Sequence, residues 1–336
     1  MKEKLLNLEA SVASIPQKIR VFFNNAMQEI YLAIDKLKNL SETNYRLGLY
    51  HMDKGNIRDA KMRFSFVLKL KPDFAPAHYH LARCHLFNLD FDKAKTELNL
   101  ALSLDPNLKV AEYRLNLVNH TIGKNENIPT QVIREDYNSL AQNYEDYMIN
   151  RLKYNAPETL VKAIEKYLTN IDKDNINALD LGCGTGLVGA FIRSEVAIKS
   201  LIGIDISANM LDLAKELVID GESVYNITKE HDFYDLKQIT GKFNLITACM
   251  SLGYVHNLQK IFAEIELLID KKSILGLVAL KSTDQDIMFD YNYACFSFSE
   301  KYLKTIFQKF NWHIEEQDEI DVFVNKVKGL MFILSK

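Results

Sequence analysis

The stretch NALDLGCGTGLVGA, residues 177–190, places four glycines within eight positions directly after a short apolar run. An apolar run that ends in glycines is typical of a buried strand followed by a tight turn. The spacing of the residues after the turn predicts a helix. Because glycine lacks a Cβ, a ligand can approach the backbone of such a turn closely. The stretch therefore predicts a ligand-binding turn between a strand and a helix.

Two classes of ligand compete for this turn. GTGLVG, from Gly184 to Gly189, fits the dinucleotide pattern G-x-G-x-x-G. That interpretation extends the strand to about Cys183 and buries Asp180 and Gly182 in it, where both residue types are disfavoured. It also brings the Asp180 carboxylate close to a doubly negative pyrophosphate. We therefore end the strand at Leu179–Asp180 and expect a different ligand.

With the strand ended there, the turn fits D-x-G-x-G-x-G and resembles the first motif of class I S-adenosylmethionine-dependent methyltransferases. The likeness covers about residues 135–336 and implies S-adenosyl-L-methionine as the cofactor. An acid beside the turn suits the cofactor's ammonium group, and the following helix N-terminus offers N–H groups. The residues expected to hold this end of the cofactor are Asp180, Gly182, Cys183, Gly184 and Gly186.

Two more acids stand at spacings that the resemblance requires. Asp205 ends the second expected strand, LIGIDIS, nineteen residues after Gly186. Its carboxylate is expected to accept both ribose hydroxyls, at about 1.5–3 kcal/mol per charge-assisted bond, and Ile206 is expected to pack on the adenine. Asp232 and Phe233 stand where this fold presents an acid to the adenine amino group beside an apolar residue.

The segment YNSLAQNYEDYMINRLKYNAPETL, residues 137–160, resembles the lead-in helices of a bacterial-type methyltransferase subgroup. The resemblance implies that Tyr144 closes over the cofactor. An amphipathic helix edge explains Tyr137 and Tyr147 equally well.

The acceptor side of the site is less defined. Amino- and nucleobase-methylating enzymes often carry N-P-P-Y or D-P-P-Y after the fourth strand, whereas this chain has CMSLGY at 249–254. Methyl transfer needs a general base only if the acceptor arrives protonated. Tyr254 and His256 are the catalytic candidates, with a solvated loop histidine as the alternative for His256. Tyr291 and Tyr293 either line an acceptor pocket or belong to the core.

The first 120 residues have helical spacing and repeat with a period of 34. Three residues of one unit recur in the next; the pairs are Ala60 and Ala94, Leu70 and Leu104, and Pro72 and Pro106. Small residues let paired helices approach, and proline stops the second helix. Residues 41–74 and 75–108 therefore resemble two tetratricopeptide repeats. The helix around 18–39 is interpreted as half of a degenerate repeat, and 109–120 as a closing helix.

Such repeats bury a core by stacking, and about three are needed for independent stability. The residues expected on their inner face are Tyr45, Leu49, Met52, Tyr79, Arg83 and Leu86. This set lacks the Lys/Asn combination with which some family members clamp a peptide carboxylate. We therefore expect an apolar protein or peptide segment as partner, or contact with the second domain.

The polar stretch TIGKNENIPT contains glycine and proline and predicts a linker at 121–134. After it, short apolar runs alternate with helical segments, which predicts a parallel sheet over 135–336. WHIEEQDEIDVFV and GLMFILSK predict an antiparallel C-terminal hairpin. The expected fold is thus multidomain, with an all-α repeat domain at 1–120 followed by an α/β, Rossmann-like methyltransferase domain.

Composition excludes several other classes of protein. The formal charge of −3, with acids and bases interleaved, gives no basic face for nucleic acid. The cysteines, which are Cys84, Cys183, Cys249 and Cys295, lie too far apart for a zinc knuckle or a disulfide framework. The N-terminus carries early acids and no long apolar core, unlike a signal peptide. We expect a cytoplasmic protein with no metal site and no membrane span.

Three functions remain in order of preference. The first is an S-adenosylmethionine-dependent methyltransferase whose helical repeats recruit a protein or small-molecule acceptor. The second is a non-catalytic tetratricopeptide scaffold with a cofactor-binding or relic methyltransferase domain. The third is a nicotinamide-dependent reductase, which the position of Asp180 disfavours.

Overall fold

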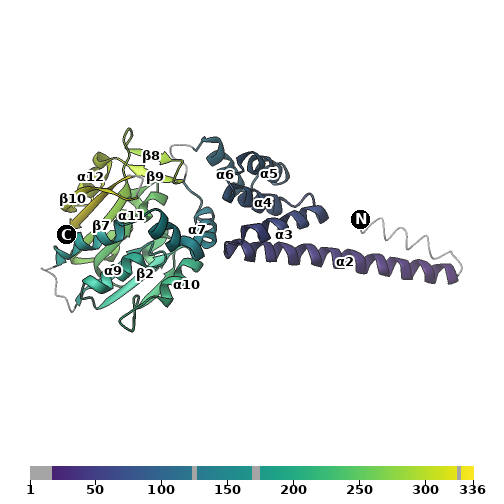
Figure 1. The fold of residues 1–336 in the computed structure, drawn as a ribbon, viewed down its shortest axis with the longest axis horizontal. Coiled ribbons are helices and arrows are strands. Elements are labelled where there is room, and N and C mark those ends of the chain that lie inside the picture. Colours follow the sequence, from purple (N-terminus) through teal and green to yellow (C-terminus); the bar gives the residue numbers. More distant parts are fainter. Residues whose placement is uncertain (1–16, 123–126, 169–174, 324–326) are drawn as a thin grey trace. The chain divides into compact units, whose positions relative to one another are not determined.

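The computed structural model describes residues 17–122, 127–168, 175–323 and 327–336, and at 17–25, 29, 31–38 and 233 it describes no side chains. Contacts divide the chain into two compact units (Figure 1). One unit contains residues 1–51 and 57–104, and the other contains 52–56 and 105–336. We describe each unit by itself.

The first unit is all-α, as the repeat pattern predicts. Its helices are α2 (Gln17–Asp53), α3 (Ile57–Leu70), α4 (Ala75–Phe87) and α5 (Phe91–Leu104). The repeated alanines Ala60 and Ala94 are fully buried. A Cβ at Gly48 would lie 2.6 Å from the ring of Phe64, so this glycine lets α2 and α3 pack closely. The small residues of the repeat therefore let neighbouring helices pack closely, as the pattern predicts.

The structure corrects the expected helix at 18–39. It is not a separate element, because α2 runs unbroken past residue 40, where an earlier repeat would turn. Helices α3 and α5 each stop two residues before a proline, Pro72 or Pro106. Lys38 stands 34 residues before Pro72, and residues 17–47 contain neither proline nor glycine. Nothing in this stretch ends a helix, so it continues.

The second unit is built on a seven-stranded sheet with the order β10-β11-β7-β6-β1-β2-β5. Its strands are β1 (Asn177–Leu181), β2 (Ser200–Asp205), β5 (Ile227–Glu230), β6 (Phe243–Cys249), β7 (Ile269–Leu280), β10 (His313–Asp321) and β11 (Lys328–Ser335). β11 runs antiparallel to both β10 and β7, while the other neighbours are parallel. The expected hairpin and mostly parallel sheet are confirmed. Two small hairpins complete the strands, β3 (Val218–Ile219) with β4 (Glu222–Ser223) and β8 (Ile287–Asp290) with β9 (Cys295–Phe298).

Helices of this unit cover both faces of the sheet. The described helices of the unit are α6 (Lys109–Asn119), α7 (Thr130–Glu145), the π-helix η1 (Asp146–Arg151), α8 (Ala156–Glu165), α9 (Leu187–Glu195), α10 (Ala208–Glu216), the 3₁₀ helices η4 (Phe233–Gln238) and η5 (Ser251–Tyr254), α11 (Leu258–Leu268) and α12 (Glu300–Lys309). Met331 and Ile333 of β11 join the apolar cluster that contains Leu160 of α8. Phe332, between them, contacts Phe307 of α12. Since neighbouring strand residues point to opposite faces, α8 and α12 lie on different sides.

Two boundaries differ from the sequence interpretation. α7 begins at Thr130, so residues 130–134 of the expected linker are helical. Pro129 precedes the helix, where its fixed φ and missing N–H are tolerated, so it starts a helix instead of extending the linker. α6, expected as the closing helix of the repeats, clusters with the second unit. The domain limits at 120 and 135 stay predictions.

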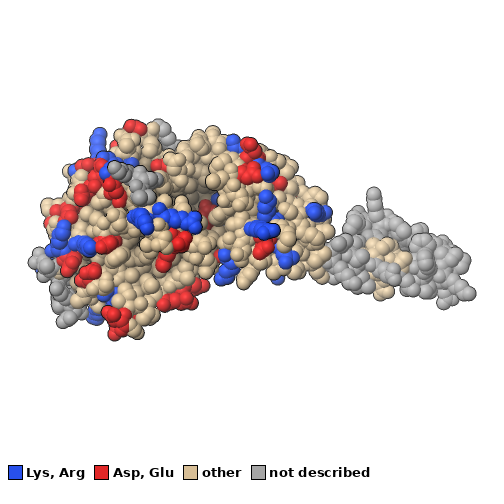
Figure 2. Space-filling model, viewed as in Figure 1, with Lys and Arg blue, Asp and Glu red and all other residues tan. Residues whose placement is uncertain are grey.

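Acidic and basic side chains are interleaved over the described surface that Figure 2 shows. None of the helices in the described ranges combines the length and apolar character needed to cross a bilayer.

Tyr225 fills a space that glycines leave open beneath the glycine turn. A Cβ at Gly203 would lie 2.7 Å from the Tyr225 ring, and a Cβ at Gly189 would overlap both the ring and the hydroxyl. Gly189, the last glycine of GTGLVG, therefore serves packing between α9 and Tyr225. Its presence does not indicate a dinucleotide.

We predict that Gly189→Ala lowers the free energy of unfolding by about 1–3 kcal/mol, because the added methyl overpacks a fully enclosed site. Urea unfolding measures this change. Ser194→Ala, at an exposed position of the same helix, is the control and should stay within about 0.5 kcal/mol of wild type. Equal stability of the two variants would contradict the packing role of Gly189.

Candidate functional site

A cavity of about 710 Å³ lies at the carboxyl ends of β1, β2, β5 and β6. The strand order reverses at β1, with β2 on one side and β6 on the other. Open α/β sheets bind ligands at such a switch point. The lining residues are Thr130, Ile133, Tyr137, Tyr144, Gly182, Gly184, Asp205, Ile206, His231, Asp232, Tyr234, Cys249, Met250, Ser251, Tyr254 and Val255.

The glycine turn follows β1 directly. The N–H groups of Gly182 and Cys183 donate to the carbonyl of Ile204, at 2.8 and 3.0 Å. Gly182, Gly184 and Gly186 have φ values of 74°, 54° and 102°, in the left-handed region that favours glycine. Gly182 and Gly184 line the cavity, whereas Cys183 and Gly186 do not. The turn thus presents backbone to the cavity at alternate residues.

Asp205 ends β2 and lines the cavity, as does Ile206. Its carboxylate accepts the N–H groups of Gly184 and Ser207, both at 2.9 Å. Burial raises the pKa of Asp205, while these backbone donors favour the ionised form. The side chain therefore fixes the glycine turn and still faces the cavity.

Asp180 lies inside β1, one residue before the strand ends, and does not line the cavity. Sequence reasoning treated a buried acid in this strand as unfavourable. The carboxylate is tolerated because it accepts hydrogen bonds from the hydroxyls of Tyr225 and Thr247, both at 2.8 Å. Burial raises its pKa to about 6. Its described bonds hold neighbouring strands together beneath the turn.

Asp232 follows β5 and lines the cavity. Its carboxylate caps η4 by accepting the Tyr234 N–H at 2.9 Å, and it also accepts the Thr130 hydroxyl at 3.0 Å. The side chain of Phe233 lies outside the described residues. His231, just before Asp232, is buried, and its Nε2 bonds to the Asp235 carbonyl.

Tyrosines from α7 and η5 form part of the cavity wall. Tyr137 and Tyr144 of α7 and Tyr254 of η5 all line the cavity. The hydroxyls of Tyr137 and Tyr254 are 2.5 Å apart and share a hydrogen bond. Burial raises the pKa of all three phenols well above the ordinary value, so they are neutral near pH 7. His256 does not line the cavity, and its ring packs edge-on against Phe296.

The turn after β6 supplies the remaining wall. Met250 has φ 62°, a left-handed conformation that is uncommon for a side chain of this size and occurs preferentially at functional sites. Ser251, which follows it, lines the cavity, and among the described residues its buried Oγ has no hydrogen-bond partner. The Tyr154 hydroxyl lies 3.3 Å from Cys249 Sγ, and burial raises the pKa of this thiol to about 12. A ligand can satisfy the Ser251 hydroxyl.

Sequence reasoning missed several lining residues. Thr130 and Ile133 lie in the stretch that the sequence predicted as a linker. Ser251 belongs to no motif that would have marked it as a site residue. His231 precedes an expected site residue and was detectable by position. Tyr291 and Tyr293 do not line the cavity. The Ile122 N–H donates to the hydroxyl of Tyr291, and Tyr293 stacks on Phe323.

The repeat residues expected to form a partner surface have different exposures. Met52, Tyr79 and Arg83 are buried, so they are not available on an open groove. Repeat spacing predicted that these side chains share the inner face, but it does not say what covers that face. Tyr45, Leu49 and Leu86 are half-buried. In the part of the chain that the structure describes, no cluster of His, Cys, Asp or Glu is placed to hold a metal ion.

Two family models match the chain. Residues 152–317 match a methyltransferase domain, and residues 51–115 match a tetratricopeptide repeat. The first match contains β1, β2, β5 and β6, whose ends form the cavity. The second contains the repeated helices α3 to α5 and most of α6.

Individual relatives are distant. A mitochondrial ubiquinone biosynthesis O-methyltransferase of Saccharomyces cerevisiae is 27% identical over 119 residues, which are 34% of this chain and 35% of the yeast protein. The chain therefore spans about a third of that relative. A 1,6-didemethyltoxoflavin-N1-methyltransferase of Burkholderia thailandensis, solved with S-adenosylhomocysteine, superposes with a TM-score of 0.50 at 13% identity, over 64% of this chain and 93% of that one. Magnesium protoporphyrin IX methyltransferase of Synechocystis gives a TM-score of 0.47 at 13% identity, over 62% and 99%.

The raised pKa of Asp180 predicts a specific pH dependence of stability. The pKa is 3.8 when unfolded and about 6 when folded, so the folded state binds the proton more tightly. Ionised Asp180 therefore destabilises the fold as pH rises through this window. Asp180→Asn removes the cost, and its free energy of unfolding relative to wild type should grow by about 2 kcal/mol from pH 4 to pH 7.

Urea unfolding of both proteins at several pH values measures this difference. Thr247→Val, which removes one hydroxyl donor from the carboxylate but keeps Asp180, should steepen the loss of stability with pH. A difference between Asp180→Asn and wild type that is constant across pH would contradict the raised pKa.

Proposed function

We propose that this protein, in which residues 152–317 match a methyltransferase domain and residues 51–115 match a tetratricopeptide repeat, transfers a methyl group from S-adenosyl-L-methionine to an acceptor. One observation carries the proposal. The cavity joins a backbone turn at Gly182 and Gly184 to the Asp205 carboxylate at the next strand end. That pairing of open backbone and acid suits a nucleoside that carries an amino acid at its other end.

The described residues fit this cofactor. No atom lies within 4 Å of the position where a Cβ would stand on Gly184, so the turn leaves room for a ligand. The backbone there would hold the methionyl end, Asp205 the ribose hydroxyls, and Ile206 and Asp232 the adenine. Asp180, at 1% exposure, would act by fixing the turn.

The charge of the lining supports a cationic ligand over a diphosphate. Asp205 and Asp232 are acidic, and the described lining residues include no lysine or arginine. A dinucleotide places a doubly negative pyrophosphate beside the glycine turn, where two carboxylates would repel it. The sulfonium and ammonium groups of S-adenosyl-L-methionine are attracted instead.

When bound, the cofactor supplies a methyl group on a cationic sulfur. The chain would contribute by holding the two reactants in line and by excluding water. The Tyr137–Tyr254 pair has raised pKa values, so it can donate or accept hydrogen bonds but does not act as a base near pH 7. An acceptor with a free lone pair can react without one. The unpartnered Ser251 hydroxyl would orient it.

The acceptor is protein or small molecule in this proposal. Tetratricopeptide repeats support recruitment of a protein partner. The yeast relative is named for an O-acceptor and the Burkholderia enzyme for an N-acceptor, so they do not point to one acceptor atom.

We predict that Asp205→Ala weakens binding of S-adenosyl-L-methionine by about 10-fold or more, because a carboxylate that accepts sugar hydroxyls is lost. Isothermal titration measures the affinity. Asp212→Ala, an exposed acid of α10 that pairs with Lys215, is the matched control and should bind like wild type. Tight binding of NADH with no binding of S-adenosyl-L-methionine would overturn the proposed cofactor.

Activity is tested with cofactor labelled in its methyl group and a cell lysate. We expect label to move to one fraction among protein, RNA and small metabolites, and to fall to background with Asp205→Ala. Cofactor binding without any transfer would support a non-catalytic scaffold instead.

A further inference from the structure

Helix α7 forms one wall of the cavity. Four of its residues, Thr130, Ile133, Tyr137 and Tyr144, line it. Any contact that sets the position of α7 therefore sets the width of the site.

Three polar contacts tie α7 to the rim of the cavity. The Thr130 hydroxyl donates to Asp232, and the Tyr137 hydroxyl bonds to Tyr254. The Ser207 hydroxyl donates to Asn138 at 2.7 Å, just after the end of β2. Because hydrogen bonds form only over short distances, these contacts require one position and one orientation of α7.

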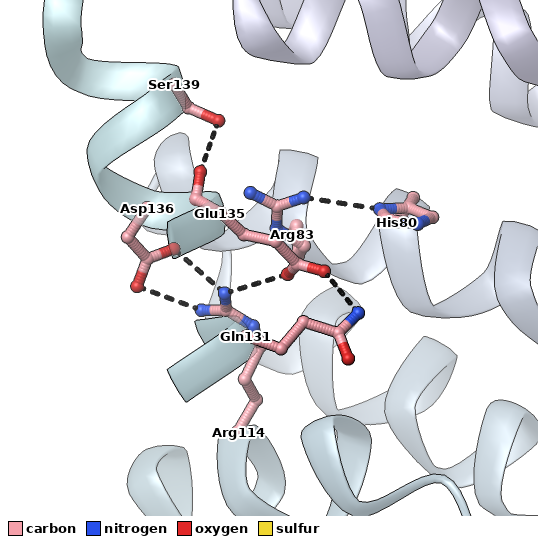
Figure 3. A network of polar contacts seen from close by, with 7 residues as sticks. All are labelled: His80, Arg83, Arg114, Gln131, Glu135, Asp136 and Ser139. Atoms are coloured by element: carbon pink, nitrogen blue, oxygen red, sulfur yellow. Dashed lines mark hydrogen bonds and ion pairs between the residues drawn. The ribbon is translucent and has the colours of Figure 1, made fainter. Parts of the chain in front are cut away.

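A buried cluster of ion pairs connects α6 to α7. Arg114 of α6 is 4% exposed, and its guanidinium reaches Asp136 through two nitrogens, at 2.8 and 3.4 Å. The same group contacts Glu135 at 3.4 Å. Figure 3 shows this guanidinium pointing between the two carboxylates of α7. Two carboxylates around one cation make a geometry that a flexible lysine would not reproduce.

The cluster is braced within α7. Gln131 donates to the second oxygen of Glu135 at 2.9 Å, and Ser139 donates to the Glu135 carbonyl at 2.8 Å. Asp136 is the residue immediately before Tyr137. The fixed cluster and the cavity-lining tyrosine are thus separated by a single peptide unit, so displacement of one moves the other.

We infer that Arg114 is a positioning residue for the cofactor site, which it serves by fixing the α7 wall. The inference rests on the proposed function. Arg114 also lies within residues 51–115, the tetratricopeptide match. The last helix of the repeat region therefore supplies the ion pair that holds a wall of the methyltransferase cavity, and a partner that displaces α6 would change cofactor affinity.

The test is titration with S-adenosylhomocysteine, paired with thermal unfolding of each variant. Arg114→Ala should bind about 10-fold more weakly, equivalent to about 1.4 kcal/mol. The double variant Glu135→Gln with Asp136→Asn keeps the shape of α7 and should lose affinity similarly. It serves as the second variant if Arg114→Ala does not fold. The charge swap Arg114→Asp with Asp136→Arg should recover affinity to within about 3-fold of wild type.

Arg193→Ala is the matched control. Arg193 is an arginine of the same unit that donates to the Val224 carbonyl and to Asn226, away from the cavity. It should lower the unfolding temperature without changing cofactor affinity. If the Arg114 and acid variants lose thermal stability yet bind like wild type, the positioning role is overturned. If wild type itself binds neither S-adenosylhomocysteine nor S-adenosyl-L-methionine, the proposed function fails first.

Discussion

The carboxylate of Asp205 connects two segments of the cavity wall that are not adjacent in the sequence. Its two bonds to the Gly184 and Ser207 N–H groups tie the turn after β1 to the loop after β2. An acid is required, because it must accept two backbone donors and still offer oxygen to a ligand. Asp180 supports this arrangement from below, where it bonds to hydroxyls from elsewhere in the chain. One acid thus lies buried within the fold, and the other faces the cavity.

The parts of this molecule that follow from local rules were predictable. Glycine spacing predicted a tight turn with an approachable backbone, and alternating apolar runs predicted the parallel sheet with its terminal hairpin. Contacts between distant residues were not predictable. Tyr225 and Thr247 make a buried Asp180 acceptable, and neither lies near it in sequence. Thr130 was assigned to a linker because the segment around it is polar, although its hydroxyl bonds to Asp232.

In the repeats, too, features that depend on nearby residues were predictable, and features that depend on distant contacts were not. The 34-residue period predicted the paired helices and their proline stops, since both depend on residues close in sequence. Their inner face was predicted to meet an apolar partner or the second domain, and Tyr79 and Arg83 on it are buried. Burial depends on what packs against a face, and a repeat pattern describes only the face itself. Ser251 was not predicted, for a related reason. A lone serine indicates a binding site only when the structure shows that its buried hydroxyl has no hydrogen-bond partner among the described residues.

The distribution of charge around the cavity constrains the proposed chemistry. Asp205 ends β2 and Asp232 follows β5, whereas η5 presents Ser251 and Tyr254, whose neutral hydroxyl bonds to Tyr137 of α7. Methyl transfer disperses the positive charge of a sulfonium in the transition state. A carboxylate placed directly against that sulfur would stabilise the reactants more than the transition state and slow the reaction. Neutral hydroxyls avoid this penalty while excluding water, and they leave the acceptor to supply its own lone pair. The wall that carries Tyr137 is the one that Arg114 contacts, so in the proposed reaction the geometry at the reacting atoms would depend on an ion pair outside the cavity.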